Sequence, residues 1–122
     1  MKLKSSILFA MLGLIMLMSC KKESTSSPTL TFTNNAIEST ANASGDYTIT
    51  GHISSAVRLD KVVLTKEGQN TAFIIDETTA KNKTEYDFSY LVSGISTNTY
   101  IVIDTYDQAG GKITQRFLIK KY

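Results

Sequence analysis

The stretch YTITGHISSAVRLDKVVLTKEG, which runs from Tyr47 to Gly68, carries the pattern that decides the fold. In its first eight residues, tyrosine, isoleucine, glycine and isoleucine alternate with threonine, threonine, histidine and serine. Alternation with a period of two is typical of a β-strand that buries one face. The stretch therefore predicts a strand over Tyr47–Ser54 and, after a short loop, a second strand over Leu59–Lys66.

The chain on both sides of this stretch repeats the same signals. Short runs of β-branched and aromatic residues are separated by Gly, Asn, Asp and Ser clusters at roughly 8 to 12 residue intervals, as in sandwiches. Strands with one apolar face must pack as two sheets, which predicts an all-β, antiparallel sandwich of about seven strands. We expect these strands at Leu30–Thr33, Tyr47–Ser54, Leu59–Lys66, Thr71–Ile75, Glu85–Val92, Thr99–Tyr106 and Lys112–Lys120.

Two segments resemble bacterial immunoglobulin-like domains. In Tyr47–Gly68 a Gly-hydrophobic-Ser stretch precedes a Leu-x-x-Val-x-Leu strand. In YDFSYLVSGISTNTYIVIDTYDQAGGK, from Tyr86 to Lys112, the last hairpin turns through Asp-x-x-Gly-Gly. The resemblance covers about Asp46 to Leu118 and implies an immunoglobulin-like sandwich over residues 29–122. It implies no function, because this fold carries many functions.

The first twenty residues have the layout of a secretory signal. A start with two lysines precedes the unbroken apolar run Ile7–Met18, which is shorter than the about 20 residues of a transmembrane helix. The segment LMSC at 17–20 resembles a bacterial lipobox. This resemblance implies a signal peptide over residues 1–19, cleavage before Cys20, and lipidation of Cys20. The alternative is an unmodified cysteine beside an ordinary cleavage site.

Residues 20–28 are predicted to form a flexible stalk behind the lipidated cysteine, because this polar segment cannot bury enough apolar surface to fold. Its start, Ser-Cys-Lys-Lys-Glu, resembles outer-membrane lipoproteins of the Bacteroidota, although charged tracts in that group are commonly more acidic. The resemblance implies lipid anchoring in the outer membrane, at the cell surface or at its periplasmic face. Two or more acyl chains make such anchoring durable.

The charge balance argues against a nucleic-acid partner. The chain has thirteen Lys+Arg and eleven Asp+Glu. Without the four lysines and one glutamate of the signal and stalk, nine cations face ten anions. A near-neutral domain predicts no basic face for nucleic acid.

Residues suited to catalysis or metal binding are scarce. The single histidine, His52, falls on the polar face of its strand, as an exposed strand residue or as a binding contact. No Gly-x-Ser-x-Gly, His-Glu-x-x-His or phosphate loop occurs, and a zinc site lacks ligands. Calcium could be held only by Asp104, Asp107 and the Asp76–Glu77 pair, but Asp107 fits better as a turn residue that accepts backbone N–H groups. We therefore expect no enzyme activity, metal or cofactor.

A tight turn is predicted to join the last two strands. A three-residue loop over 109–111 with a left-handed glycine would pair Gln108 with Lys112. The same register would place Ile103 opposite Phe117, both in the core.

The outer face of this hairpin is the candidate binding face. The predicted register places Asp104 opposite Arg116 and Tyr106 opposite Thr114. Aromatic rings beside directional polar groups suit sugar rings or a partner protein. Cross-strand pairing that only stiffens the sheet is the alternative. The candidate residues are Tyr100, Val102, Asp104, Tyr106 and Arg116.

Together these features predict a lipid-anchored module of the cell envelope with a non-catalytic binding or spacer role, in contact with the membrane through its anchor. The alternative is an accessory subunit of an outer-membrane glycan-uptake or adhesion assembly, with a glycan or protein ligand. An aromatic platform on the outer face would favour glycan or protein binding, and a flat polar surface would favour a spacer.

Overall fold

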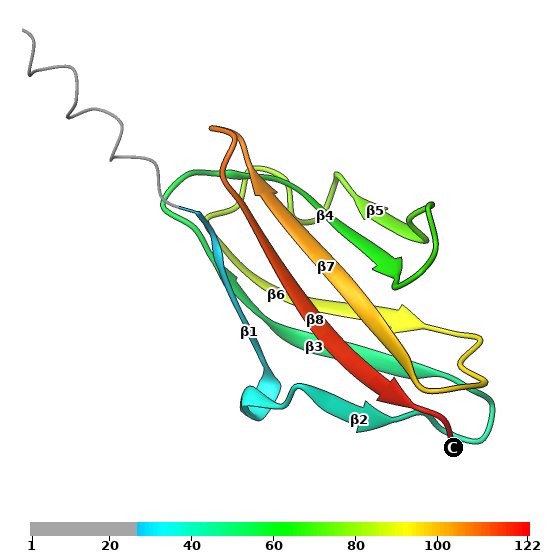
Figure 1. Cartoon of the computed structure of the whole chain (residues 1–122). Coiled ribbons are helices and arrows are strands. Elements are labelled where there is room, and N and C mark those ends of the chain that lie inside the picture. Colours follow the sequence, from blue (N-terminus) through cyan, green and yellow to red (C-terminus); the bar gives the residue numbers. More distant parts are fainter. Residues whose placement is uncertain (1–26) are drawn as a thin grey trace, which may run out of the picture.

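The structure is a computed structural model that describes residues 27–122 (Figure 1). Its strands are β1 Thr29–Phe32, β2 Glu38–Thr40, β3 Tyr47–Ser54, β4 Leu59–Lys66, β5 Ile74–Asp76, β6 Glu85–Val92, β7 Thr99–Asp107 and β8 Lys112–Lys120. A short 3-10 segment, η1, lies at Thr33–Asn35. The three-stranded sheet has the order β1-β3-β6 and the five-stranded sheet the order β2-β8-β7-β4-β5. The predicted all-β sandwich is confirmed.

The first segment of the domain takes part in both sheets. β1 pairs antiparallel with β3, and after η1 the chain crosses to the other sheet, where β2 pairs parallel with β8. Every other strand pair is antiparallel. One edge of the sandwich is therefore closed by a single stretch of chain, visible in Figure 1 as β1 followed by β2.

Four of the predicted strands have the predicted bounds. β1 lies one residue earlier than predicted, β7 ends one residue later, and two further elements differ more. β2 was not expected, because Glu38–Thr40 is polar and shows no alternation. Backbone pairing with β8 forms it, and the Ala41 N–H donates to the Lys120 carbonyl at 2.9 Å just beyond it. β5 begins at Ile74 rather than Thr71, because the preceding residues belong to the loop that returns from β4.

The core lies between the sheets and combines fully buried aliphatic side chains with a cluster of aromatic rings. Phe117 meets Phe32 edge-on, with 5.0 Å between ring centroids, and stacks on Tyr47 at 5.6 Å. Phe117 lies opposite Ile101 on β7 rather than opposite Ile103 as predicted. Each fully buried side chain of this size contributes about 1.5–3 kcal/mol. The aromatic cluster therefore links β1 and β3 of the three-stranded sheet to β8 of the five-stranded sheet.

Gly51 provides the room for a second ring of this cluster. It pairs with Phe88 across the β3–β6 ladder. A Cβ atom at Gly51 would lie 2.6 Å from a Phe88 ring atom, and closer still to the backbone oxygen of Thr31. The glycine in the alternating stretch is therefore required by packing.

The two ends of the sandwich carry different loops. The proximal end, where the described chain begins, holds the loops 55–58, 77–84 and 108–111. The distal end holds the loops 41–46, 67–73 and 93–98 and the chain end at Tyr122, as Figure 1 shows. Pro28, assigned above to the stalk, has a fully buried side chain, so the packed domain begins at this residue.

The predicted signal peptide over residues 1–19, Cys20, and the stalk up to residue 26 lie outside the described residues. The part of the chain from 27 to 122 contains no helix that is long and apolar enough to cross a membrane.

Candidate functional site

The predicted binding face lies on the outside of the five-stranded sheet. β7 alternates along its length, and its inward residues Ile101, Ile103 and Thr105 are fully buried. The outward positions of β7 and β8 bring together the predicted residues Tyr100, Val102, Asp104, Tyr106 and Arg116.

The turn between β7 and β8 is longer than predicted, and this shifts the register by two residues. The last pair joins Tyr106 to Lys112. One carboxylate oxygen of Asp107 accepts the backbone N–H groups of Ala109 and Gly111 at 2.9 and 2.7 Å. Asp107 therefore acts as the predicted turn residue, and by closing a wider turn it ends the ladder earlier than a three-residue loop would.

The shift changes pairing partners but not faces. Asp104 lies opposite Thr114, whose hydroxyl donates to its carboxylate at 2.5 Å, and Arg116 lies opposite Val102. The predicted pairing of Asp104 with Arg116 is therefore wrong. A displacement by two residues preserves the face of every side chain, because strand faces alternate with a period of two.

Cations cover both tyrosines of the outer face. The Lys61 and Lys112 ammonium nitrogens lie 5.1 and 5.3 Å from the Tyr106 ring centroid. The Arg116 guanidinium lies 3.8 Å from the centroid of Tyr100. These distances allow attraction between a cation and the negative face of a ring. The outer face thus presents cations held over rings rather than bare aromatic rings.

Arg116 also reaches the distal loops. Its Nη2 donates to Glu67 Oε1 at 2.7 Å, and both side chains are about half exposed, at 49% and 47%. Shallow grooves of about 380 and 410 Å³ flank Tyr100 on its two sides, within the about 300–1,000 Å³ of small-ligand sites. The first groove is lined by the polar side chains Gln69, Ser96, Thr97 and Asn98 together with Lys66 and Glu67.

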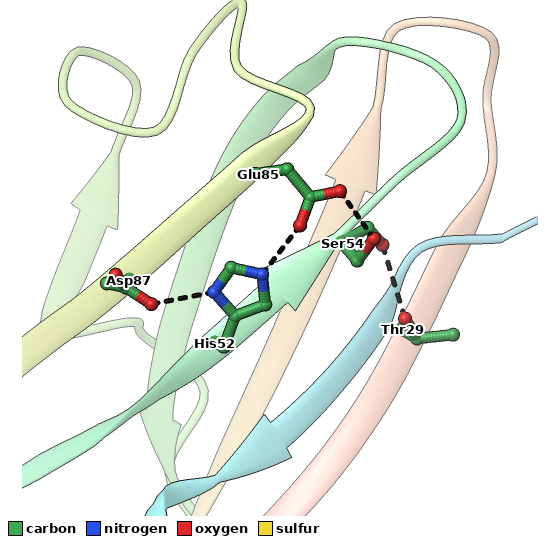
Figure 2. A network of polar contacts seen from close by, with 5 residues as sticks. All are labelled: Thr29, His52, Ser54, Glu85 and Asp87. Carbon is green, nitrogen blue, oxygen red and sulfur yellow. Dashed lines mark hydrogen bonds and ion pairs between the residues drawn. The ribbon is translucent and has the colours of Figure 1, made fainter.

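The outer face of the three-stranded sheet carries a separate polar network (Figure 2). The His52 ring nitrogens Nδ1 and Nε2 lie 2.6 Å from Asp87 and 2.6 Å from Glu85. The Ser54 hydroxyl donates to the second Glu85 oxygen at 2.8 Å, and the Thr29 hydroxyl donates to the Ser54 carbonyl at 3.3 Å. Hydrogen bonds to Asp87 and then to Glu85 raise the pKa of His52.

The sequence pattern does not reveal this network. His52 lies on the polar face of its strand, as predicted, but its partners lie 33 and 35 residues away on β6. The alternation of β6 puts its two carboxylates on one face, and only the β3–β6 register brings them beside the histidine. The polar groups of this network are hydrogen-bonded to one another.

A buried carboxylate links the two sheets. Asp76, at the end of β5, accepts the backbone N–H groups of Thr78 and Thr79 at 3.1 and 2.9 Å and the Tyr90 hydroxyl at 2.7 Å. Burial alone raises the pKa of this carboxyl, but hydrogen bonds from Thr79, Tyr90 and the backbone outweigh it and lower the pKa to about 2. Tyr90 belongs to β6 of the other sheet, so Asp76 holds the sheets together.

The aspartates considered as calcium ligands are not brought together. Asp76 and Asp107 each close a turn, and Asp104 accepts from Thr114 on the outer face. In residues 27–122 no three His, Cys, Asp or Glu side chains form a group that could hold a metal ion.

Comparison with known proteins identifies the fold. No protein-family model matches this chain, and no curated protein matches it either. Among solved structures it is similar to the fibronectin(III)-like modules of CbhA from Clostridium thermocellum, with a TM-score of 0.53 and 19% identity. The match covers 80% of this chain and 48% of that one, so this chain spans about half the length of its structural neighbour. Fibronectin(III)-like modules share the immunoglobulin-like sandwich architecture, and the predicted fold is confirmed.

Proposed function

We propose that this chain is a lipid-anchored module of the cell envelope whose sandwich has a non-catalytic binding or spacer role. The observation that carries the proposal is that the described chain begins at one end of the sandwich and finishes at the other (Figure 1). A tether at Cys20 would hold the proximal end and leave the distal loops facing away from the membrane. Strands of eight or nine residues at about 3.3 Å each make this spacing ~30 Å.

The distribution of ionisable groups supports a non-catalytic role. In the described residues, the carboxylates of Asp76 and Asp107 are closed within turns. Both ring nitrogens of His52 are engaged in hydrogen bonds with Asp87 and Glu85 on the outer face of one sheet, and Arg116 lies on the outer face of the other. General acid–base catalysis needs such groups to converge within hydrogen-bond reach of one substrate.

A second candidate function is an accessory subunit that captures a glycan or protein in an outer-membrane uptake or adhesion assembly. It is favoured by the position of Tyr100, 37% exposed between two shallow grooves near the distal end. Hydroxyl and amide side chains in the first groove are hydrogen-bonding partners for sugar hydroxyls.

Metabolic labelling with a radiolabelled fatty acid tests the anchor. The wild-type chain should incorporate label and sediment with membranes, whereas Cys20→Ala should incorporate none, because it lacks the thiol. Ser19→Ala, which keeps a small residue before the cysteine, is the matched control and should be labelled. Equal labelling of wild type and Cys20→Ala would refute the proposal.

A glycan array separates binding from spacing. If Tyr100 carries a site, Tyr100→Ala should reduce any array signal at least tenfold, and His52→Gln, on the other sheet, should leave it unchanged. An array without hits for the wild type would count against glycan capture and favour the spacer role.

A further inference from the structure

Five cationic side chains surround the proximal end of the five-stranded sheet. Hydrogen bonds hold their segments together: the Gln108 N–H donates to the Arg58 carbonyl, and the Gln108 side chain donates to Leu59 O and Asn82 Oδ1 at 3.0 and 2.7 Å. The cations belong to the β3–β4 loop, β4, the 77–84 loop and the start of β8. This basic patch consists of Arg58, Lys61, Lys81, Lys83 and Lys112.

Most of the patch is not neutralised by the domain itself. Lys81 pairs with Asp60 at 3.0 Å, and Lys112 lies 3.9 Å from Asp104. Within residues 27–122, no carboxylate lies within 4.0 Å of the side-chain nitrogens of the remaining three, Arg58, Lys61 and Lys83.

The carboxylates of the proximal end are mostly occupied. Glu85 is engaged by His52 and Ser54 on the other sheet. Asp107 is buried in its turn. In the described part of the chain, Glu77 is the acidic side chain of this end that makes no ion pair or hydrogen bond. One unpaired carboxylate cannot neutralise three unpaired cations.

The centre of the patch has the composition of a membrane interface. Tyr106 lies between the Lys61 and Lys112 ammonium groups. Tyrosine combines an apolar ring with a polar tip, and lysine combines an apolar stem with a charged head, which suits both to the boundary between lipid and water.

We infer that the basic patch docks the domain onto the anionic lipid head groups of the membrane that anchors it. The inference rests on the proposed lipidation of Cys20. Pro28 lies eight positions after Cys20 in the sequence, which allows at most about 29 Å between them. A domain tethered by its proximal end on so short a chain keeps the patch near the bilayer. Each Lys or Arg near an anionic surface strengthens association about fivefold.

Energy transfer from the lipidated full chain in vesicles tests the docking. Cys20 is the single cysteine of the chain, so Ala109→Cys, at the exposed proximal turn, adds one thiol for a fluorophore once Cys20 carries its lipid. Transfer to a head-group acceptor should be greater in phosphatidylcholine vesicles that contain phosphatidylglycerol than in pure phosphatidylcholine. High salt should remove the difference, because it screens charges. The same fluorophore at Ser96→Cys, in a distal loop, should not gain transfer.

Charge-neutralising variants identify the patch as the cause. The triple variant Arg58→Gln, Lys61→Gln and Lys83→Gln should lose the phosphatidylglycerol-dependent rise. The control Lys66→Gln, Lys120→Gln and Lys121→Gln removes the same charge from the distal end and should keep it. Melting curves of both variants would verify that they fold, and the salt titration of the wild type needs no variant.

The outcomes separate docking from anchoring. If the wild type does not float with pure phosphatidylcholine vesicles, the anchor is refuted and the docking with it. Flotation without a phosphatidylglycerol-dependent change in transfer would overturn the docking alone. An unchanged transfer accompanied by binding of a soluble acidic polysaccharide to the patch would also overturn it, in favour of a glycan partner.

Discussion

The two ends of the sandwich use the same turn chemistry in different surroundings. At the proximal end, Asp76 accepts two backbone N–H groups while 9% exposed. At the distal end, Asn42 accepts the N–H groups of Ser44 and Asp46, both at 2.9 Å, from an exposed position. A hydrogen bond to a buried group is costly to lose, because no water replaces the partner. The comparison teaches that the proximal end carries the greater share of stability and that the distal end is freer to vary.

The largest difference between the ends should follow from removing these two side chains. Asp76→Ala should lower the free energy of unfolding by about 3 kcal/mol, because the buried Tyr90 hydroxyl loses its acceptor. Asn42→Ala should cost about 1 kcal/mol or less. Urea denaturation measures both, and equal losses would break the comparison.

Acid should weaken the proximal end through Asp76. A carboxyl with a lowered folded pKa stabilises the fold above its unfolded pKa, 3.8, and loses that contribution as the pH falls through about 2. The difference in unfolding free energy between the wild type and Asp76→Asn should therefore shrink by about 2 kcal/mol between pH 5 and pH 2. A difference that does not depend on pH would contradict the low pKa.

Removing the hydrogen-bonded link between the proximal loops should have a moderate effect on the free energy of unfolding. Gln108→Ala removes two hydrogen bonds, to Leu59 O and Asn82 Oδ1, and should cost about 1 kcal/mol. Hydrogen exchange of backbone amides should accelerate in the loops 55–58 and 77–84. Gln115→Ala, a change of the same kind within β8, is the control and should leave those loops unchanged.

The exposed ion pair near the distal end should contribute little to the free energy of unfolding. A double-mutant cycle of Glu67→Gln and Arg116→Gln should give a coupling energy below about 1 kcal/mol that falls with added salt. A larger coupling that resists salt would show that the distal end is held as firmly as the proximal one.

The smallest effect is expected from the polar network of Figure 2. A histidine with a raised folded pKa stabilises the fold below its unfolded pKa of 6.5, and this contribution is lost as the pH rises through the folded value. The melting temperature of the wild type relative to His52→Gln should therefore be slightly higher at pH 5.5 than at pH 8.5. The reverse order would contradict the two ion pairs.

Strands with one buried face could be predicted from the sequence. The alternation in Tyr47–Ser54 and Glu85–Val92 marks β3 and β6 with the bounds observed, because each strand buries every second side chain. β2 could not be predicted, because its pairing uses backbone groups that every residue carries. The start of β5 could not be predicted either, because it depends on where the preceding loop rejoins the sheet.

The candidate face could be predicted more reliably than its contacts. Alternation alone assigns Tyr100 and Arg116 to the outer face. Their contact depends on the register, which the Asp107 turn determines through hydrogen bonds within the fold. The network of His52 depends on a pairing between distant segments, which no local pattern encodes. Lipidation of Cys20 stays a prediction.

The crossing of the first segment between the sheets has a mechanical consequence. Drag on a tethered domain would pull on Pro28 along the axis of β1, away from the distal end. The hydrogen bonds of β1 with β3 would then bear the load together, in shear, rather than opening one after another. Beyond η1, the parallel pairing of β2 with β8 transfers the remaining load to the second sheet. A module tethered through this segment is therefore held through both of its sheets.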